Sequence, residues 1–156
     1  KKSSPLERFE AQLLLIALKS SEGFDKIQDV VQIHNLTNQK VRTVFNYLKV
    51  IYSESRRFNL ETAAEVLDFD ILTFINAIIK NLPPVEDINN ELNRLLPNYR
   101  IELLNNRIKE LSDEEVKVLS DATLSVDERR RGYDTLKQKE MKLKTLRTEL
   151  INKMKN

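Results

Sequence analysis

Glycine occurs only twice in this chain of 156 residues, and proline occurs four times. β-Hairpins and other tight turns depend on these two residues for backbone angles that most residues avoid. The rest of the sequence is rich in leucine, glutamate, lysine, asparagine and arginine, most of which favour helices. We therefore predict an all-α fold. A single modest core is expected, because 40% of the residues are apolar and 32% are charged.

The residue types exclude several classes of function. The chain has no cysteine, which rules out disulfides, thiolate zinc sites and cysteine nucleophiles. His34 is the only histidine, so no histidine pair exists for a metal, and a surface or capping role is predicted for it. No glycine-rich phosphate loop or nucleophile elbow occurs, and a helix start explains the acidic pair Asp68 and Asp70. We expect no catalytic site, no cofactor and no metal.

Insertion into a membrane is not predicted. The longest apolar run near the start, LLLIAL at 13–18, is too short to cross a bilayer and lacks the pattern of a signal peptide. We therefore expect a soluble protein, and the absence of cysteine is compatible with the cytoplasm.

The first half of the chain contains start and stop signals for several short helices. Ser4 and Glu7 have capping-box spacing around Pro5, which predicts a helix to about Ser20. Gly23 permits a turn before a second helix over 24–33. Further helices are predicted after a cap at Thr37 or Asn38, from Asn59 through Leu67, and from Asp68 to Leu82.

The helix predicted over 69–82 is apolar on nearly all sides, which is typical of a central helix. Pro83 and Pro84 end it, because neither residue offers an amide proton. Eight of the ten aromatic residues precede position 84. We therefore predict a helical bundle subdomain over 1–83 and a second subdomain over 84–156.

Long polar helices with a narrow apolar stripe are predicted after position 84. The apolar residues recur at three- and four-residue intervals, which suits packing against one partner helix rather than a globular core. Lys139 and Glu140 interrupt the stripe in the last helix. The members of the apolar stripe are Ile101, Leu104, Ile108, Leu111 and Val118 in the first long helix and Tyr133, Leu136, Leu143, Leu146 and Leu150 in the last helix.

Two capping signals divide this region. The segment SDATLS at 120–125 supplies a turn, and Ser125 with Glu128 has capping-box spacing at the start of the last helix. Ser112 and Glu115 have the same spacing, which predicts that the preceding helix breaks near Leu111.

Charge is unevenly distributed, although the formal net charge is only +2. Residues 84–128 carry 5 basic and 11 acidic side chains, whereas residues 129–156 carry 10 basic and 3 acidic ones. Antiparallel packing of the last helix on its predecessor would place a region of charge −6 beside a region of charge +7. We therefore predict a protruding C-terminal helical hairpin, whose leftover apolar and charged surface suits docking on another protein.

The last helix and its surroundings resemble a known family. The string LSVDERRRGYDTLKQKEMKLK follows a helical bundle and a proline-bearing arm, LNRLLPNYRIELLNNRIKEL, and in this setting it resembles the C-terminal helicase-interaction domain of bacterial replicative DNA primase. The opening ERFEAQLLLIAL resembles the first helix of that domain. Gly132 and the long segment between Leu111 and Leu124 depart from the family's pattern. The residues that resemble its Leu-Ser-x-x-Glu-Arg motif and the continuation of that motif are Leu124, Ser125, Glu128 and Arg129, then Thr135, Leu136 and Gln138.

The resemblance implies that the chain is the non-catalytic tail of a DNA primase, a nucleotidyltransferase whose zinc-binding and polymerising domains lie outside this chain. Its bundle would resemble the N-terminal domain of the hexameric replicative helicase. Its hairpin would bind that helicase domain, and its bundle would modulate helicase activity. Primer synthesis would thereby be recruited to the replication fork in the bacterial cytoplasm.

The predicted partner-binding surface lies on the last helix and is selected by exposure and charge. Packing of Tyr133 and the leucines inside the hairpin is an alternative explanation for those residues. Two other functions remain open: a helical scaffold or adaptor module of another assembly, and a basic helix that binds nucleic acid. Acidic neighbours of the basic run and the lack of an aromatic cluster argue against direct nucleic-acid binding. The selected residues are Arg129, Arg130, Tyr133, Leu136, Lys137, Glu140, Leu143, Lys144 and Arg147.

Overall fold

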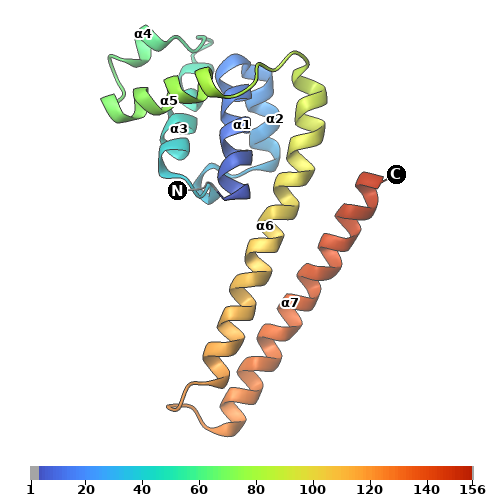
Figure 1. Ribbon diagram of the computed structural model, residues 1–156. Coiled ribbons are helices and arrows are strands. Elements are labelled where there is room, and N and C mark those ends of the chain that lie inside the picture. Colours follow the sequence, from blue (N-terminus) through green and yellow to red (C-terminus); the bar gives the residue numbers. More distant parts are fainter. Residues whose placement is uncertain (1–3, 156) are drawn as a thin grey trace. The chain divides into compact units, whose positions relative to one another are not determined.

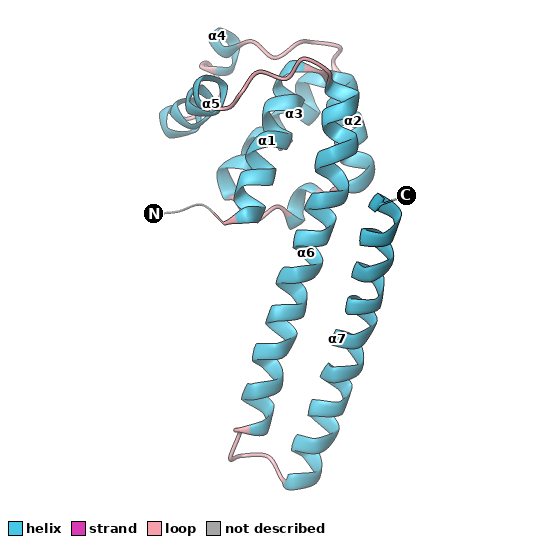
Figure 2. Cartoon of the chain, turned by 45° about the vertical axis from the view of Figure 1, so that its right-hand side comes forward, coloured by secondary structure: helices cyan, strands magenta, loops and turns pink. Residues whose placement is uncertain are grey.

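The computed structural model describes residues 4–155, and its architecture confirms the predicted all-α fold (Figure 1). A helical bundle is followed by two long helices that form a hairpin, and the described residues contain no strand (Figure 2). In chain order, the elements are α1 (Pro5–Lys19), α2 (Ser21–Val30), the 3₁₀ helix η1 (Ile33–Asn35), α3 (Gln39–Ser53), α4 (Leu60–Ala63), α5 (Phe69–Asn81), α6 (Ile88–Leu119) and α7 (Val126–Lys155).

The chain divides into two compact units between residues 99 and 100, a point that lies inside helix α6. The first unit contains α1 to α5 and the beginning of α6, and the second contains the remainder of α6 and α7. Pro83 and Pro84, where the sequence analysis placed a subdomain boundary, lie in the loop between α5 and α6. The beginning of α6 contributes to the bundle through the buried side chains Leu92, Leu95 and Tyr99.

Helix α1 is central to the bundle and packs against α2, α3 and α5. The predicted capping box is present: the Ser4 hydroxyl accepts a hydrogen bond from the Glu7 amide, and the Glu7 carboxylate accepts one from the Ser4 amide. Every residue from Leu13 to Leu18 is buried, because neighbouring helices cover α1 on several sides. Burial of each leucine or isoleucine in this run stabilises the fold by about 1.5–3 kcal/mol.

Gly23 lies inside α2, so the predicted turn at this residue is wrong. The helix starts at Ser21, because the Ser20 hydroxyl accepts a hydrogen bond of 2.9 Å from the Gly23 amide and caps the helix. A β-carbon at position 23 would lie 2.8 Å from Cγ2 of Ile16 and 3.3 Å from Cγ2 of Ile88. Glycine is therefore needed here for the close approach of helices.

Two asparagine caps begin α3 and α4, as expected. The Asn38 side chain accepts hydrogen bonds from the amides of Lys40 and Val41, and Asn59 caps α4 in the same way. Helix α4 ends at Ala63, so the prediction that it continues through Leu67 is wrong. The apolar face predicted for α3 is buried at Val41, Val44, Phe45, Leu48 and Ile51.

Helix α5 is not the central helix that its composition predicts. Only Ile71, Ile75 and Ile78 are buried, whereas the Phe69 side chain is 84% exposed. Packing against α1 and α3 uses one face of the helix, so apolar residues on a second face remain at the surface. The prediction of a central helix is therefore wrong, because too few neighbours surround α5 to bury all its apolar residues.

A buried carboxylate joins α1 to the start of α3 and to α6. Glu10 accepts hydrogen bonds from the backbone amides of Thr37 (2.9 and 3.1 Å) and Asn38 (3.1 Å), and from the hydroxyls of Thr37 (3.0 Å) and Tyr99 (3.2 Å). The amides immediately precede the first turn of α3, where the helix dipole favours a negative charge. Burial, together with the charge of Glu10, raises the pKa of the Tyr99 hydroxyl and keeps it a donor. The sequence analysis did not identify Glu10, although its four-residue spacing from Leu6 places it on the buried face of α1.

Helix α6 continues from Ile88 to Leu119, so the predicted break near Leu111 is wrong. Leu111 is buried, and so is Glu115, the residue predicted to complete a capping box with Ser112. Glu115 instead forms an ion pair with Lys137 of α7. Since α6 is continuous here, there is no helix start for Glu115 to cap.

Candidate protein-interaction surface

The second unit is a helical hairpin made of α7 and the part of α6 that follows residue 99 (Figure 1). On α6, Ile108 and Leu111 are buried. On α7, Glu140 is the only buried residue among those described, and leucines of the predicted stripe such as Leu136 and Leu143 are half-buried. The hairpin therefore leaves part of its own apolar stripe accessible.

Two polar motifs order the loop of the hairpin. The predicted capping box at the start of α7 is present, because the Ser125 amide donates to the Glu128 carboxylate at 2.9 Å and the Glu128 amide donates to the Ser125 hydroxyl at 3.1 Å. Asp121 accepts hydrogen bonds from the amide and the hydroxyl of Thr123. These hydrogen bonds hold the pKa values of Asp121 and Glu128 below their ordinary values.

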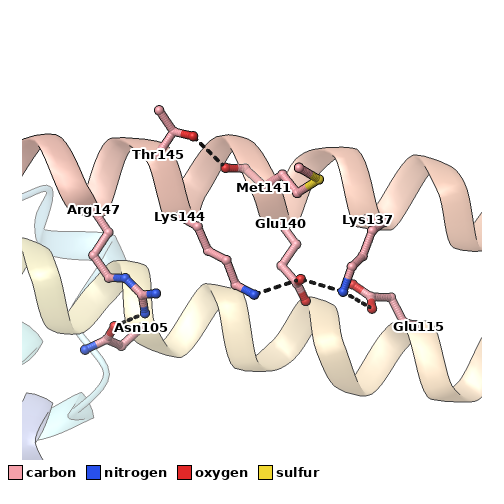
Figure 3. A network of polar contacts seen from close by, with 8 residues as sticks. All are labelled: Asn105, Glu115, Lys137, Glu140, Met141, Lys144, Thr145 and Arg147. Atoms are coloured by element: carbon pink, nitrogen blue, oxygen red, sulfur yellow. Dashed lines mark hydrogen bonds and ion pairs between the residues drawn. The ribbon is translucent and has the colours of Figure 1, made fainter.

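A layer of four charged side chains interrupts the apolar stripe (Figure 3). Glu140 is only 2% exposed, and its Oε2 lies 3.0 Å from Nζ of Lys137 and 3.2 Å from Nζ of Lys144. Nζ of Lys137 also lies 3.7 Å from Oε1 of the buried Glu115 on α6. Glu140, which the sequence analysis treated as a gap in the stripe, is thus the centre of a charged layer between the two helices.

The electrostatics of the charged layer favour an ionised Glu140. Hydrogen bonding by Lys137 holds the pKa of Glu140 below its ordinary value, with Lys144 and Glu115 acting in the same direction and desolvation opposing them. The same hydrogen bond raises the pKa of Lys137. Burial of such a layer costs desolvation free energy, and its best-attested benefit is to specify the register of paired helices.

Two of the predicted partner-binding arginines make contacts within the hairpin. The Arg129 guanidinium donates to the Leu124 carbonyl through Nε at 3.2 Å and Nη2 at 3.1 Å. Nη1 of Arg147 donates to Oδ1 of Asn105 on α6 at 2.7 Å (Figure 3). These hydrogen bonds restrain both side chains, whereas Arg130 is exposed.

The other predicted residues differ in the surface that they offer. Lys137 and Lys144 belong to the charged layer, yet more than 40% of each side chain remains exposed. Glu140 offers almost no surface to a partner. The aromatic and apolar residues of the set, Tyr133, Leu136 and Leu143, are all half-buried.

An apolar group near the loop was not identified from the sequence. Val116, Leu119 and Val126, called the tip cluster here, are 65%, 49% and 67% exposed. Two of them end α6 and the third begins α7. All three fall outside the apolar stripe. Their signal in the sequence is an apolar residue at a position where the helical pattern predicts a polar, solvent-facing one.

A shallow groove of about 540 Å³ lies between α6 and α7 near the tip cluster. Gly132 contributes to it, and a β-carbon at this position would lie 3.0 Å from Cγ1 of Val118. The chain therefore places an apolar groove, with charged side chains among its lining residues, in the same part of the hairpin as exposed apolar residues. The lining residues are Glu114, Lys117, Val118, Arg131, Gly132, Thr135 and Leu136.

His34 is exposed and lines a polar cleft of about 640 Å³ formed by residues of α2, η1 and α3. The other lining residues include Arg42 and Lys49, together with side-chain amides such as Gln28 and Gln39. Within residues 4–155, no group of three or more histidine, cysteine, aspartate or glutamate side chains is arranged to hold a metal ion. None of the helices in this range combines the length and apolar character needed to cross a membrane.

Comparison of the chain with protein families, with curated proteins and with solved structures finds no match.

Proposed function

We propose that this chain is a non-catalytic helicase-binding domain of a bacterial DNA primase. Its hairpin docks on the N-terminal domain of the hexameric replicative helicase, and its bundle modulates the helicase. In this way the domain recruits primer synthesis to the replication fork in the cytoplasm.

The incomplete burial of α7 is the observation that carries this proposal. In the described part of the helix, the only residue removed from solvent is a glutamate, while the leucines are half-buried or exposed. A pair of helices with an accessible apolar stripe is stabilised when a partner covers that stripe. The resemblance to the helicase-interaction domain of primase is also strongest over 124–144, at the start and middle of this helix.

The charged side chains of α7 favour a protein partner over nucleic acid. Arg129 donates to a backbone carbonyl, and Nε of Arg131 also donates to a carbonyl, that of Asp127 at 3.4 Å. These contacts occupy part of the basic run that would otherwise bind phosphates. Exposed cations such as Arg130 and Lys142 instead suit steering toward an acidic protein surface.

Titration of the helicase N-terminal domain with this chain tests the proposal by calorimetry. We expect a complex whose affinity falls at least about tenfold when Leu119→Lys and Val126→Glu are combined, because both remove exposed apolar contacts at the tip cluster. The new charges suit the helix dipoles, since Leu119 ends α6 and Val126 begins α7. The hairpin is therefore expected to remain folded.

Val50→Lys is the matched control, because Val50 is 56% exposed near the end of α3 in the bundle. Its affinity for the helicase is expected to equal that of the wild type. Failure of the wild-type chain to bind the helicase would contradict the proposed function. A parallel titration with single-stranded DNA at low salt separates the alternative, since DNA binding without helicase binding would favour a nucleic-acid partner.

A further inference from the structure

The second face of α5 carries a stripe of three apolar residues and one asparagine that the bundle leaves largely uncovered. Phe69, Leu72, Asn76 and Ile79 recur at spacings of three, four and three residues. Phe69 and Ile79 are 84% and 41% exposed, Asn76 is exposed, and Leu72 is half-buried. This spacing places the four side chains on one face of the helix, as at the a and d positions of a coiled coil.

The stripe is complementary to itself when two copies of α5 pair in opposite directions. In that arrangement Phe69 of one copy lies level with Ile79 of the second copy, and Leu72 lies level with Asn76 of the second copy. Both layers form at the same register, because both pairs are centred on position 74: Phe69 and Ile79 lie five residues on either side of it, and Leu72 and Asn76 lie two residues on either side. The face therefore meets the requirement of a two-fold interface, in which one patch contacts the same patch of another molecule.

The charges at the ends of α5 favour this antiparallel direction. Asp68 and Asp70 lie at the start of the helix, and Lys80 lies at its end. Antiparallel pairing brings the acidic end of each copy to the level of the basic end of the other, and it also aligns the helix dipoles favourably. Parallel pairing would set like charges beside each other.

We propose that two copies of this chain associate through the outer stripe of α5, with the two α5 helices antiparallel. A helix of 13 residues is about 20 Å long, so the contact area is small and the dimer is weak. Asn76 lowers the affinity further, because it faces Leu72 of the second copy and finds no polar partner there. A dissociation constant on the order of 10–100 μM is expected for a contact of this size.

Sedimentation equilibrium of the full chain between about 5 μM and 500 μM tests the association, because this range brackets the expected dissociation constant. The average mass is expected to rise toward that of a dimer for the wild type and to remain monomeric for Phe69→Glu. Phe69 is the first residue of α5, where a negative charge suits the helix dipole, so this variant is expected to fold. Val50→Lys, which alters an exposed apolar side chain of α3 in the same bundle, is expected to dimerise like the wild type. A wild-type chain that stays monomeric over the whole range would overturn the proposal.

Single cysteines test the direction of pairing, because the natural chain contains none. Under mild oxidation, a mixture of Leu72→Cys and Asn76→Cys is expected to form a disulfide-linked dimer faster than either variant alone, since the antiparallel register places these two positions opposite each other. Faster self-linking of Leu72→Cys would indicate parallel pairing and overturn the proposed arrangement. Neither experiment contains helicase, so the outcome is independent of the proposed function.

Discussion

Glu10 illustrates how one buried polar residue organises several helices. Its carboxylate is fully buried, yet it accepts hydrogen bonds from two backbone amides and two hydroxyls. A buried charge is tolerated when such donors replace water, and its removal leaves those donors without partners. The residue therefore connects α1 to the start of α3 and to Tyr99 of α6 more specifically than an apolar side chain would.

Replacement of Glu10 by leucine is expected to lower the free energy of unfolding by about 3 kcal/mol or more, because buried amides and hydroxyls would lose their acceptor. Glu10→Gln keeps one acceptor oxygen and is expected to cost less. Urea denaturation followed by circular dichroism measures both changes. A loss below about 1 kcal/mol for the leucine variant would show that water or a rearranged backbone satisfies these donors.

The two glycines are expected to respond differently to alanine. At Gly23 the added carbon would lie 2.8 Å from Ile16, a fully buried side chain, so Gly23→Ala is expected to destabilise the bundle by about 1–3 kcal/mol. At Gly132 the nearest atom belongs to Val118, a half-buried side chain that lines the shallow groove between α6 and α7. Gly132→Ala is therefore expected to be neutral or to stabilise α7 by up to about 1 kcal/mol through its higher helix propensity. Thermal unfolding of both variants checks the difference, and equal destabilisation would contradict it.

At the scale of the helices, packing decides features that local sequence patterns describe poorly. The apolar composition of α5 indicates a central helix, but only one of its faces finds neighbours in the bundle. The serine and glutamate spacing at 112–115 indicates a helix start, but Glu115 is engaged by Lys137 and α6 continues. In both cases a contact with a distant segment overrides a local signal.

Removal of the buried carboxylates of the charged layer is expected to stabilise the hairpin at neutral pH. The double variant Glu115→Leu, Glu140→Leu should gain up to about 3 kcal/mol, because leucines replace groups whose desolvation is costly and leave Lys137 and Lys144 partly in water. Hydrogen exchange of the α7 amides measures this change locally. Glu114→Leu, at a half-buried site outside the layer, is expected to shift exchange by less than about 0.5 kcal/mol.

The same variant should lose the acid sensitivity of the hairpin. The pKa of Glu140 lies below its ordinary value of 4.5 in the folded chain, so the unfolded chain takes up its proton first as the pH falls. The stabilisation from this residue is thus present above pH 4.5 and is lost as the pH decreases through the folded-state pKa. Exchange measured from pH 6 to about pH 3 should show a smaller loss of protection in the double variant than in the wild type, and equal losses would contradict the assigned role.

For the molecule as a whole, the sequence predicts the helical class, the bundle, the hairpin and most helix starts. These features are local, because three- and four-residue periodicity and capping pairs such as Ser125 with Glu128 act within one or two turns. The Glu10 cluster is not local, since its partners lie 27 to 89 residues away along the chain. The tip cluster escapes prediction for another reason: its residues lie outside the periodic apolar stripe, so helix periodicity does not single them out.

An insertion in the loop of the hairpin and an insertion in one of its long helices should have different effects on the charged layer. Lys137 reaches Glu115 across the hairpin at one register only, and the loop over 120–125 lies on one side of that contact. An extra residue in the loop leaves the contact possible, whereas an extra residue within α7 would turn the preceding part of the helix by about 100° away from its partner. Natural length variation in chains of this kind is therefore expected to accumulate in the loop and to be rare in either long helix.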